Sequence, residues 1–175
     1  QAQQPSQNTT QQNNTLSKFS VKGIRFGMLK DEVIQAAKVS GVSTGTIGDM
    51  LRSGGQMSIN FGSLLGVSSE PDMNSRDFGS ELFYKGMPAY LKFTDNKLVG
   101  IIFINKSSII FELSKQLVSK FGSPDTSDDS KWQNRMGQTL DNKKMAWQNV
   151  DGASIMLKVR DDKVNQGTLI FAEVN

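Results

Sequence analysis

Apolar and polar residues alternate along several short segments, mostly in the second half of the chain. This two-residue period is typical of strands that bury one face of a sheet. It predicts strands at residues 81–85, 88–94, 98–105, 145–149, 154–160 and 168–174. The turn signals Asp95-Asn96, Val150-Asp151-Gly152 and residues 160–163 separate successive strands, so the strands should form antiparallel hairpins.

Two other segments carry the pattern of helices. Residues 108–121 place Ile110, Leu113, Leu117 and Phe121 at helical spacing. Gly122 suits the position just after a helix, and Pro124 prevents the helix from continuing. A second helix is predicted at residues 29–39, because two acidic residues stand in its first turn and apolar residues follow.

The first half of the chain has weaker patterns. Residues 19–24 alternate weakly and predict a short strand. Residues 40–80 are rich in Gly and Ser, and we expect one or two short strands near residues 56–61 and a long loop through residues 70–80. Residues 1–17 carry no charge and only one large apolar side chain, which predicts a disordered polar tail.

These elements predict an α+β fold, in which helices pack on one face of an antiparallel sheet. With 175 residues, the chain is long enough for residues 18–175 to form a single domain with its own core. Residues 90–97 (YLKFTDNK) also match residues 156–163 (MLKVRDDK). This match suggests two related helix–strand repeats at residues 19–104 and 105–175, although any hairpin with an Asp turn and apolar flanks would look similar.

Composition removes several classes of chemistry. The chain has no cysteine and no histidine, which excludes disulfides, Cys/His zinc sites and every catalytic triad that needs an imidazole. The net charge is only +3, with 20 basic and 17 acidic residues spread evenly, so no basic stripe points to nucleic acid. No apolar run approaches the length needed to cross a membrane, and no cofactor is expected.

Two segments resemble a known family. Residues 23–33 (GIRFGMLKDEV) resemble the G-I-x-x-G-M-x-x-x-x-V helix opening of small exported bacterial proteins, namely the SmpA/OmlA outer-membrane-assembly lipoproteins and the β-lactamase-inhibitor-protein-like group. Residues 120–125 (KFGSPD), followed by Trp132, look like the L-G-x-P that ends the second helix there. The resemblance covers roughly residues 19–40 and 90–174. The chain departs from the family in lacking the lipid-acceptor cysteine and in its long Gly/Ser-rich segment.

The resemblance implies helices packed on an antiparallel sheet, a unit that the inhibitor proteins repeat twice. It also implies an exported domain that binds other proteins. The polar start of the chain at Gln1 suits a mature exported protein, so we expect a periplasmic or secreted location.

Motifs for catalysis and ion binding are weak. Residues 41–45 match G-x-S-x-G, but a helix is predicted before the serine and there is no histidine to take its proton, so we interpret the match as a loop. The acids Asp125, Asp128 and Asp129 lack the spacing of a calcium loop and predict a solvated acidic loop. No metal site and no catalytic residue are predicted, although two carboxylates that meet in space could still form a histidine-free hydrolase.

A binding surface is the preferred hypothesis. In the predicted sheet, Tyr90, Lys92, Met156, Lys158 and Arg160 fall on the face opposite the apolar side chains. Tyr, Met and Arg are enriched at protein interfaces, and the cations suit a mildly acidic protein partner. The alternative is an ordinary solvated face.

We therefore expect a non-enzymatic, exported protein-binding module, of an inhibitor or immunity-like or an envelope-assembly accessory type. It would use this face or the loops of residues 40–80. A structural component of a secretion system or of the envelope is a second hypothesis, and the hydrolase is a third.

Overall fold

In the computed structural model, residues 16–39, 43–44, 57–60, 78, 88–161, 163 and 165–174 are described. Along the chain, these residues form β1 (Ser20–Val21), β2 (Ile24–Arg25), α1 (Lys30–Val39), β3 (Ser43–Thr44), β4 (Met57–Asn60), β5 (Pro88–Thr94), β6 (Lys97–Lys106), α3 (Ser107–Phe121), β7 (Thr126–Gln133), β8 (Thr139–Val150), β9 (Ala153–Lys158) and β10 (Gln166–Glu173).

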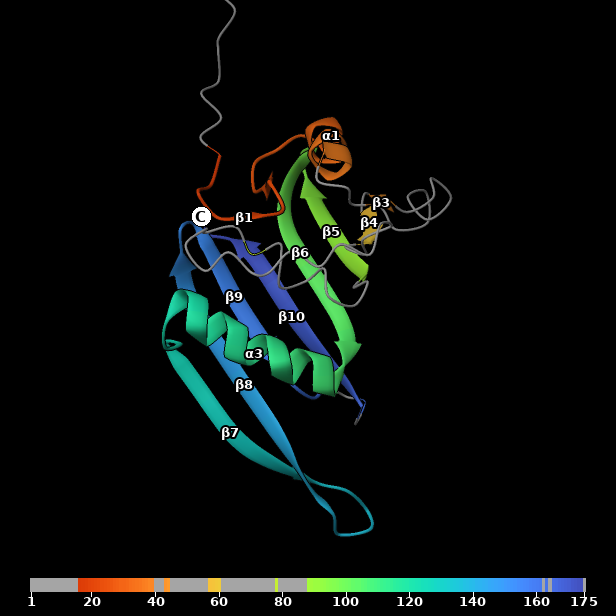
Figure 1. Cartoon of the computed structure of the whole chain (residues 1–175), viewed down its shortest axis with the longest axis vertical. Helices are drawn as coiled ribbons and strands as arrows, with labels where there is room; N and C mark the ends of the chain where they lie inside the picture. The colour runs from red at the N-terminus through yellow and green to blue at the C-terminus, as the bar shows by residue number, and fades with distance from the viewer. Residues whose placement is uncertain are drawn as a thin grey trace, which may run out of the picture.

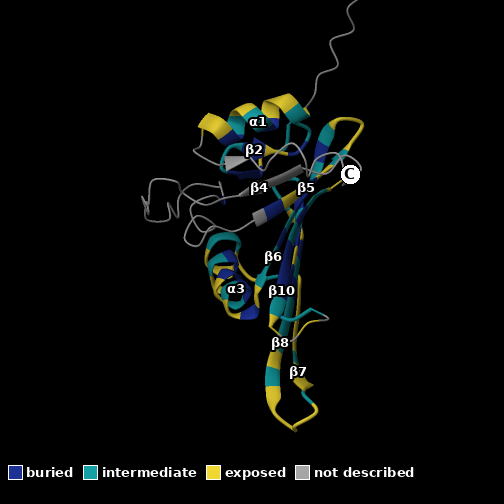
Figure 2. Ribbon diagram, turned by 90° about the vertical axis from the view of Figure 1, so that its right-hand side faces the viewer, coloured by how far each residue is buried: buried dark blue, intermediate teal, exposed yellow. Residues whose placement is uncertain are grey.

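Eight strands form one antiparallel sheet in the order β3-β4-β5-β6-β10-β9-β8-β7 (Figure 1). The strands β1 and β2 form a separate hairpin. Both helices lie on the same side of the large sheet, with α3 along its middle and α1 at the end near the turn between β5 and β6 (Figure 2). The predicted α+β fold with helices on one face is therefore confirmed. We call the face that carries α3 the inner face and the opposite face the open face.

Most predicted elements have matching strands in the structure. The predicted strands at residues 56–61, 88–94, 98–105, 145–149, 154–160 and 168–174 correspond to β4, β5, β6, β8, β9 and β10. The segment at residues 19–24 forms two short strands instead of one. The predicted strand at residues 81–85, most of the polar tail and the predicted loop through residues 70–80, except Phe78, lie outside the described residues.

The turns have the backbone conformation that their sequences require. Asp95 and Asn96 both have positive φ angles (49° and 61°), as do Asp151 and Gly152 (54° and 92°). Two successive positive φ values give a tight hairpin turn whose twist matches that of the flanking strands, and Asn, Asp and Gly tolerate them best. These turns close the β5–β6 and β8–β9 hairpins, and a register shift in each, between Lys92 and Phe93 and between Trp147 and Val150, sets the pairing farther along the strands.

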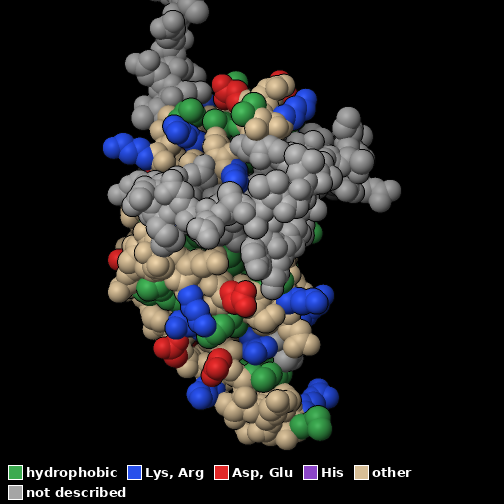
Figure 3. Space-filling view, viewed as in Figure 1, with side chains coloured by type: hydrophobic (Ala, Val, Ile, Leu, Met, Phe, Trp, Pro, Cys, Tyr) green, Lys and Arg blue, Asp and Glu red, His purple; other side chains and the backbone are tan. Residues whose placement is uncertain are grey.

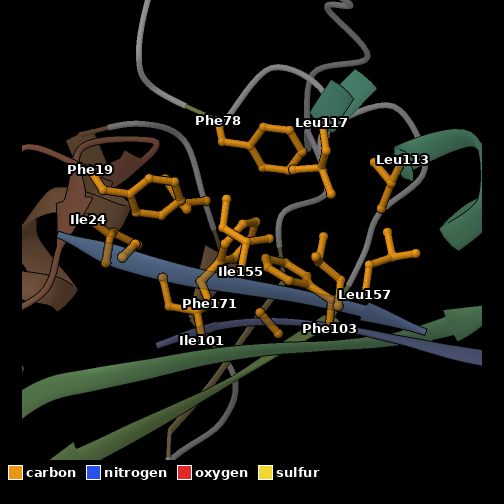
Figure 4. Close-up of a cluster of buried hydrophobic side chains, with 14 of the residues drawn as sticks. Phe19, Ile24, Phe78, Ile101, Phe103, Leu113, Leu117, Ile155, Leu157 and Phe171 are labelled. Atoms are coloured by element: carbon orange, nitrogen blue, oxygen red, sulfur yellow. The ribbon is translucent and has the colours of Figure 1, made fainter. Parts of the chain in front are cut away.

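Aromatic side chains form the centre of the core between α3 and the inner face (Figure 4). The ring of Phe171 lies 5.1, 5.4 and 5.9 Å from the rings of Phe19, Phe78 and Phe103. The Phe78 backbone N–H donates a hydrogen bond of 2.9 Å to the carbonyl oxygen of Ser20. Aliphatic side chains from the sheet and α3 complete the core: Leu91, Ile101, Leu113, Leu117, Ile155, Leu157 and Leu169.

The carboxyl end of α3 is tied to the sheet. Gly122 follows the helix with φ 81°, as its sequence position predicts, and its N–H donates to the carbonyl oxygen of Val118 (2.9 Å). The indole Nε1–H of Trp147 donates to the carbonyl oxygen of Gly122 (3.0 Å). Trp147 and its face neighbour Met145 are buried, which confirms their predicted place in the core.

The prediction of an acidic loop after α3 is correct for Asp125, which lies exposed between α3 and β7, and wrong for the other two acids. Asp128 and Asp129 lie in β7, which pairs along its whole length with a longer β8 than predicted. Neither helical nor strand periodicity marks β7, since all its residues are exposed or half-buried. Backbone pairing with β8 holds this strand in place, because β7 has no apolar face that packs on the core. The β7–β8 hairpin extends past the rest of the fold (Figure 2).

The proposed duplication stays a prediction. In the described residues, each half runs as one helix followed by four strands, and the β5–β6 and β9–β10 hairpins both lie in the large sheet. The strands β3 and β4 are much shorter than β7 and β8. A shared order of elements is not in itself a repeat.

Gly167 of β10 occupies a position with no room for a side chain. A Cβ atom there would overlap the carbonyl oxygen of Val159 and would lie 2.7 Å from that of Lys158 and 3.0 Å from Cβ of Ile110. We expect Gly167→Ala to lower the free energy of unfolding by about 2–3 kcal/mol, because strand backbones must move apart. Urea unfolding followed by circular dichroism measures this change.

Gly100→Ala is the matched control within the same sheet. A Cβ atom there would meet Cβ of Lys92 at 3.5 Å, which is an ordinary contact. Its effect should stay below about 1 kcal/mol. Equal effects of the two substitutions would contradict the packing described around Gly167.

The Trp147 anchor gives a second prediction. Trp147→Phe removes the hydrogen bond to Gly122 and some buried volume, and we expect a loss of about 1–2 kcal/mol in the free energy of unfolding. Trp132 is 39% exposed, so Trp132→Phe should change the free energy of unfolding by less than about 0.5 kcal/mol. Amide hydrogen exchange at the end of α3 should speed up only in the first variant. An unchanged exchange rate there would show that the indole does not hold the helix end.

Candidate functional site

One continuous row of side chains crosses the open face. Directly paired residues in an antiparallel sheet lie on the same face. Tyr90 is paired with Ile102, Ile102 with Ile170, Ile170 with Met156, and Met156 with Ala146. Five neighbouring strands therefore each place one apolar or aromatic side chain in line. We call these five residues the central row.

The central row is accessible in the described part of the fold. Met156 is 53% exposed and Tyr90 is 43% exposed, whereas Ile102, Ile170 and Ala146 are half-buried. α3 lies on the inner face, and no described helix or strand lies on the open face (Figure 2). A sheet covered on one side usually presents polar side chains on the other. An apolar row across five strands departs from that pattern.

Polar and small side chains, with Ile104 as the one apolar exception, flank the central row on both sides. On one side, Lys92, Gly100, Ala172 and Ser154 form a paired row. On the other side, Ile104, Thr168, Lys158 and Lys144 form a paired row, which ends at Asp128 on β7. The apolar strip thus has a polar border that carries three lysines.

The charges of this border are partly balanced. The Nζ atom of Lys158 lies 3.6 Å from a carboxylate oxygen of Asp161, and the hydroxyl of Thr168 donates to the same carboxylate (2.9 Å). Asp128 is paired directly with Lys144 across β7 and β8. The open face is therefore mildly basic. Lys92 lies at the opposite border from the two acids, Asp128 and Asp161.

The structure brings together four of the five predicted binding residues. Tyr90 and Met156 are in the central row, and Lys92 and Lys158 lie in the two flanking rows. Arg160 is elsewhere, because β9 ends at Lys158. Its Nε–H donates to the carbonyl oxygen of Asp141 (2.7 Å), and the side chain lines a groove at the amino end of α3.

This groove consists of two adjoining hollows of about 550 and about 290 Å³, which share Phe111 and Asp141. The β7–β8 hairpin forms one wall. There the Nζ atom of Lys143 lies 3.5 Å from Asp129, and that of Lys131 lies 3.8 Å from Asp141. Acidic and basic side chains are intermixed on this side of the molecule (Figure 3). The groove therefore has no strong charge of one sign.

The acidic residues form no metal site in the described ranges. Among these residues, no three acidic side chains come close enough to hold an ion. Asp125 instead accepts a hydrogen bond from the Gln148 backbone N–H (2.6 Å), and Asp129 pairs with Lys143. Of the G-x-S-x-G match, only Ser43 and Thr44 are described, and their backbone forms β3 instead of the predicted loop.

Sequence reasoning missed three members of the central row, namely Ile102, Ile170 and Ala146. The run Ile101–Ile104 is apolar on both faces of β6 and reads as an ordinary buried strand. Only the register of five strands shows that the outward residues line up with Tyr90 and Met156. One signal for an uncovered face was present in the sequence. Only two helices were predicted, and two helices are too few to cover both faces of a wide sheet.

The described helices include none that is both long and apolar enough to cross a membrane. Comparison with known proteins gives no relative. No family model, no curated protein and no solved structure matches this chain.

Proposed function

We propose that this chain is an exported, non-enzymatic module that binds another protein through its open face. The central row carries this proposal, because five in-register strands present an apolar strip that no described element covers. The role would be that of an inhibitor or immunity-like protein or of an envelope-assembly accessory. The periplasmic or secreted location rests on the sequence resemblance.

The chemistry of the open face supports a protein partner. Protein interfaces have an apolar centre and a polar rim, and they are enriched in Tyr and Met. Tyr90 and Met156 are the two most exposed members of the central row, and they stand toward opposite ends of it. Tyr offers a rigid contact area, and Met adapts its shape to an irregular surface. A partner that covers both would bury the strip between them.

The border charges favour a mildly acidic partner. Lys92 and Lys144 lie on opposite sides of the central row, and Lys158 already has Asp161 beside it. Acidic groups on a partner would meet these cations at the rim, where they guide association more than they add affinity. Binding should therefore weaken as salt is added.

The groove gives less support to a hydrolase. A carboxyl group that acts as a general acid is usually sheltered from water. The two carboxylates of the groove that form ion pairs, Asp129 and Asp141, are 74% and 73% exposed. Each has a lysine beside it, so neither has the surroundings of a proton donor.

An affinity capture from source-cell extract, followed by binding measurements with the purified candidate, tests the proposal. We expect Tyr90→Ser/Met156→Ser to weaken binding by at least about tenfold, because two apolar contacts become polar. Lys92→Glu/Lys158→Glu should also weaken it, with the larger effect at low ionic strength. Titration calorimetry of the purified pair gives the dissociation constants.

Val118→Ser/Lys115→Glu is the control on α3, because it combines one change of each kind, the loss of an exposed apolar side chain and the reversal of a lysine, away from the open face. It should bind like the wild-type chain, and all variants should show the same circular dichroism. A partner that binds every variant equally would place the site away from the open face. Failure of the wild-type chain to bind any protein would contradict the proposed function.

A further inference from the structure

The strand β7 forms one border of the large sheet, and its outer edge is open in the described part of the fold (Figure 1). Such an edge offers unpaired backbone N–H and C=O groups to another strand. β7 has eight residues, whereas β3 at the opposite border has only two. Among the described strands, β7 is therefore the better site for strand addition.

The hydrogen bonds of β8 determine which residues of β7 face this edge. The carbonyl oxygen of Lys143 accepts from the Val159 N–H (2.8 Å), so the backbone of Lys143 faces β9. Backbone groups alternate in direction along a strand, so Asn142 faces β7, and its carbonyl oxygen indeed accepts from the hydroxyl of Ser130 (3.2 Å). Ser130 therefore faces β8. Its two neighbours, Asp129 and Lys131, direct their backbone N–H and C=O groups to the open edge.

The side chains of these two edge residues carry opposite charges on the inner face. Asp129 is paired with Lys143 of β8 at 3.5 Å, and Lys131 is paired with Asp141 at 3.8 Å. Along the edge, an acid and a base thus stand on either side of Ser130. This arrangement is self-complementary under a twofold rotation about Ser130.

We propose that β7 pairs antiparallel with β7 of a second copy of this chain, with Ser130 facing Ser130. In this register, Asp129 lies directly opposite Lys131 of the second copy, and Lys131 lies opposite its Asp129. A shift of two residues in either direction would place Asp129 or Lys131 opposite itself, and like charges in that position are destabilising. The charges therefore favour the register with Ser130 facing Ser130 over its two neighbouring registers.

The pairing extends an existing charge pattern. Each side of the twofold axis has a four-strand row that reads Lys143, Asp129, then Lys131 and Asp141 of the second copy. A single exposed ion pair contributes little, but alternating charges in a row act together and specify the register. The interface is isologous, as in most homodimers. It places both open faces on the same side, and it does not depend on the binding role of those faces.

Charge reversal in two separate proteins tests this dimer. Asp129→Lys puts lysines opposite each other across the twofold axis, and Lys131→Glu puts acids opposite each other. We expect each variant to raise the dimer dissociation constant by about tenfold or more in sedimentation equilibrium. An equimolar mixture of the two variants restores both opposite-charge pairs, so it should form a heterodimer of nearly wild-type affinity.

The mixture also controls for damage within each chain. Each substitution disturbs its own pair with β8, and that disturbance persists in the mixture, so recovery can come only from contacts between chains. Lys163→Glu makes the same charge change at an exposed residue away from β7, and it should leave dimerisation unchanged.

Disulfide cross-linking of a single introduced cysteine tests the register, because the native chain contains no cysteine. In the proposed pairing, the two Ser130 residues form a non-hydrogen-bonded pair with Cα atoms about 4.5 Å apart, which suits a disulfide. Ser130→Cys should therefore cross-link under mild oxidation. Ser127→Cys would place the two thiols about 20 Å apart, so it should stay uncross-linked.

Three results would overturn the proposal. The first is a wild-type chain that stays monomeric at concentrations up to about 1 mM, which would leave this edge to a strand of another protein. The second is a dimer that the mixture of charge variants does not restore. The third is faster cross-linking of Ser127→Cys than of Ser130→Cys, which would mean a different register or a different interface.

Discussion

The packing of Phe171 against the rings of Phe19, Phe78 and Phe103 is the contact on which the rest of the sheet depends. Side chains alternate strictly along a strand, so fixing Phe171 on the inner face directs Ile170 to the open face. The register then extends this choice to every neighbouring strand. A slip of one residue would expose the aromatic core, and burial of that core thus also positions the central row.

The same constraint explains why the two ends of the sheet differ. The middle strands are held by the core under α3, whereas β7 contributes no residue to the buried set. Backbone pairing with β8 holds this strand, and the exposed ion pairs of Asp129 and Lys131 across the hairpin add little to it. One fold therefore presents three distinct surfaces: an open face with an apolar row inside a mildly basic border, a groove of mixed charge and a charged open edge.

Local signals in the sequence predicted much of this architecture. The Asp95-Asn96 turn, the apolar spacing of α3 and the glycine after it act within a few residues, and each produced the expected element. β7 has no such signal, because pairing with its partner strand stabilises it and no apolar face does. Only two of the five residues of the central row were predicted, since the pairing of Ile102 with Ile170 joins residues far apart in the chain. Residue alternation placed Tyr90 and Met156 on the correct face, but it could not align them.

The most direct test of the central claim is photo-cross-linking in the living source cell, with a photoreactive amino acid at position 156. Met156 is 53% exposed at the central row, whereas Val118 is 36% exposed on α3 and serves as the reference position. If the open face binds a partner, position 156 yields one discrete cross-linked protein and position 118 does not. A cross-link at position 118 alone, or none at either position, would contradict the account.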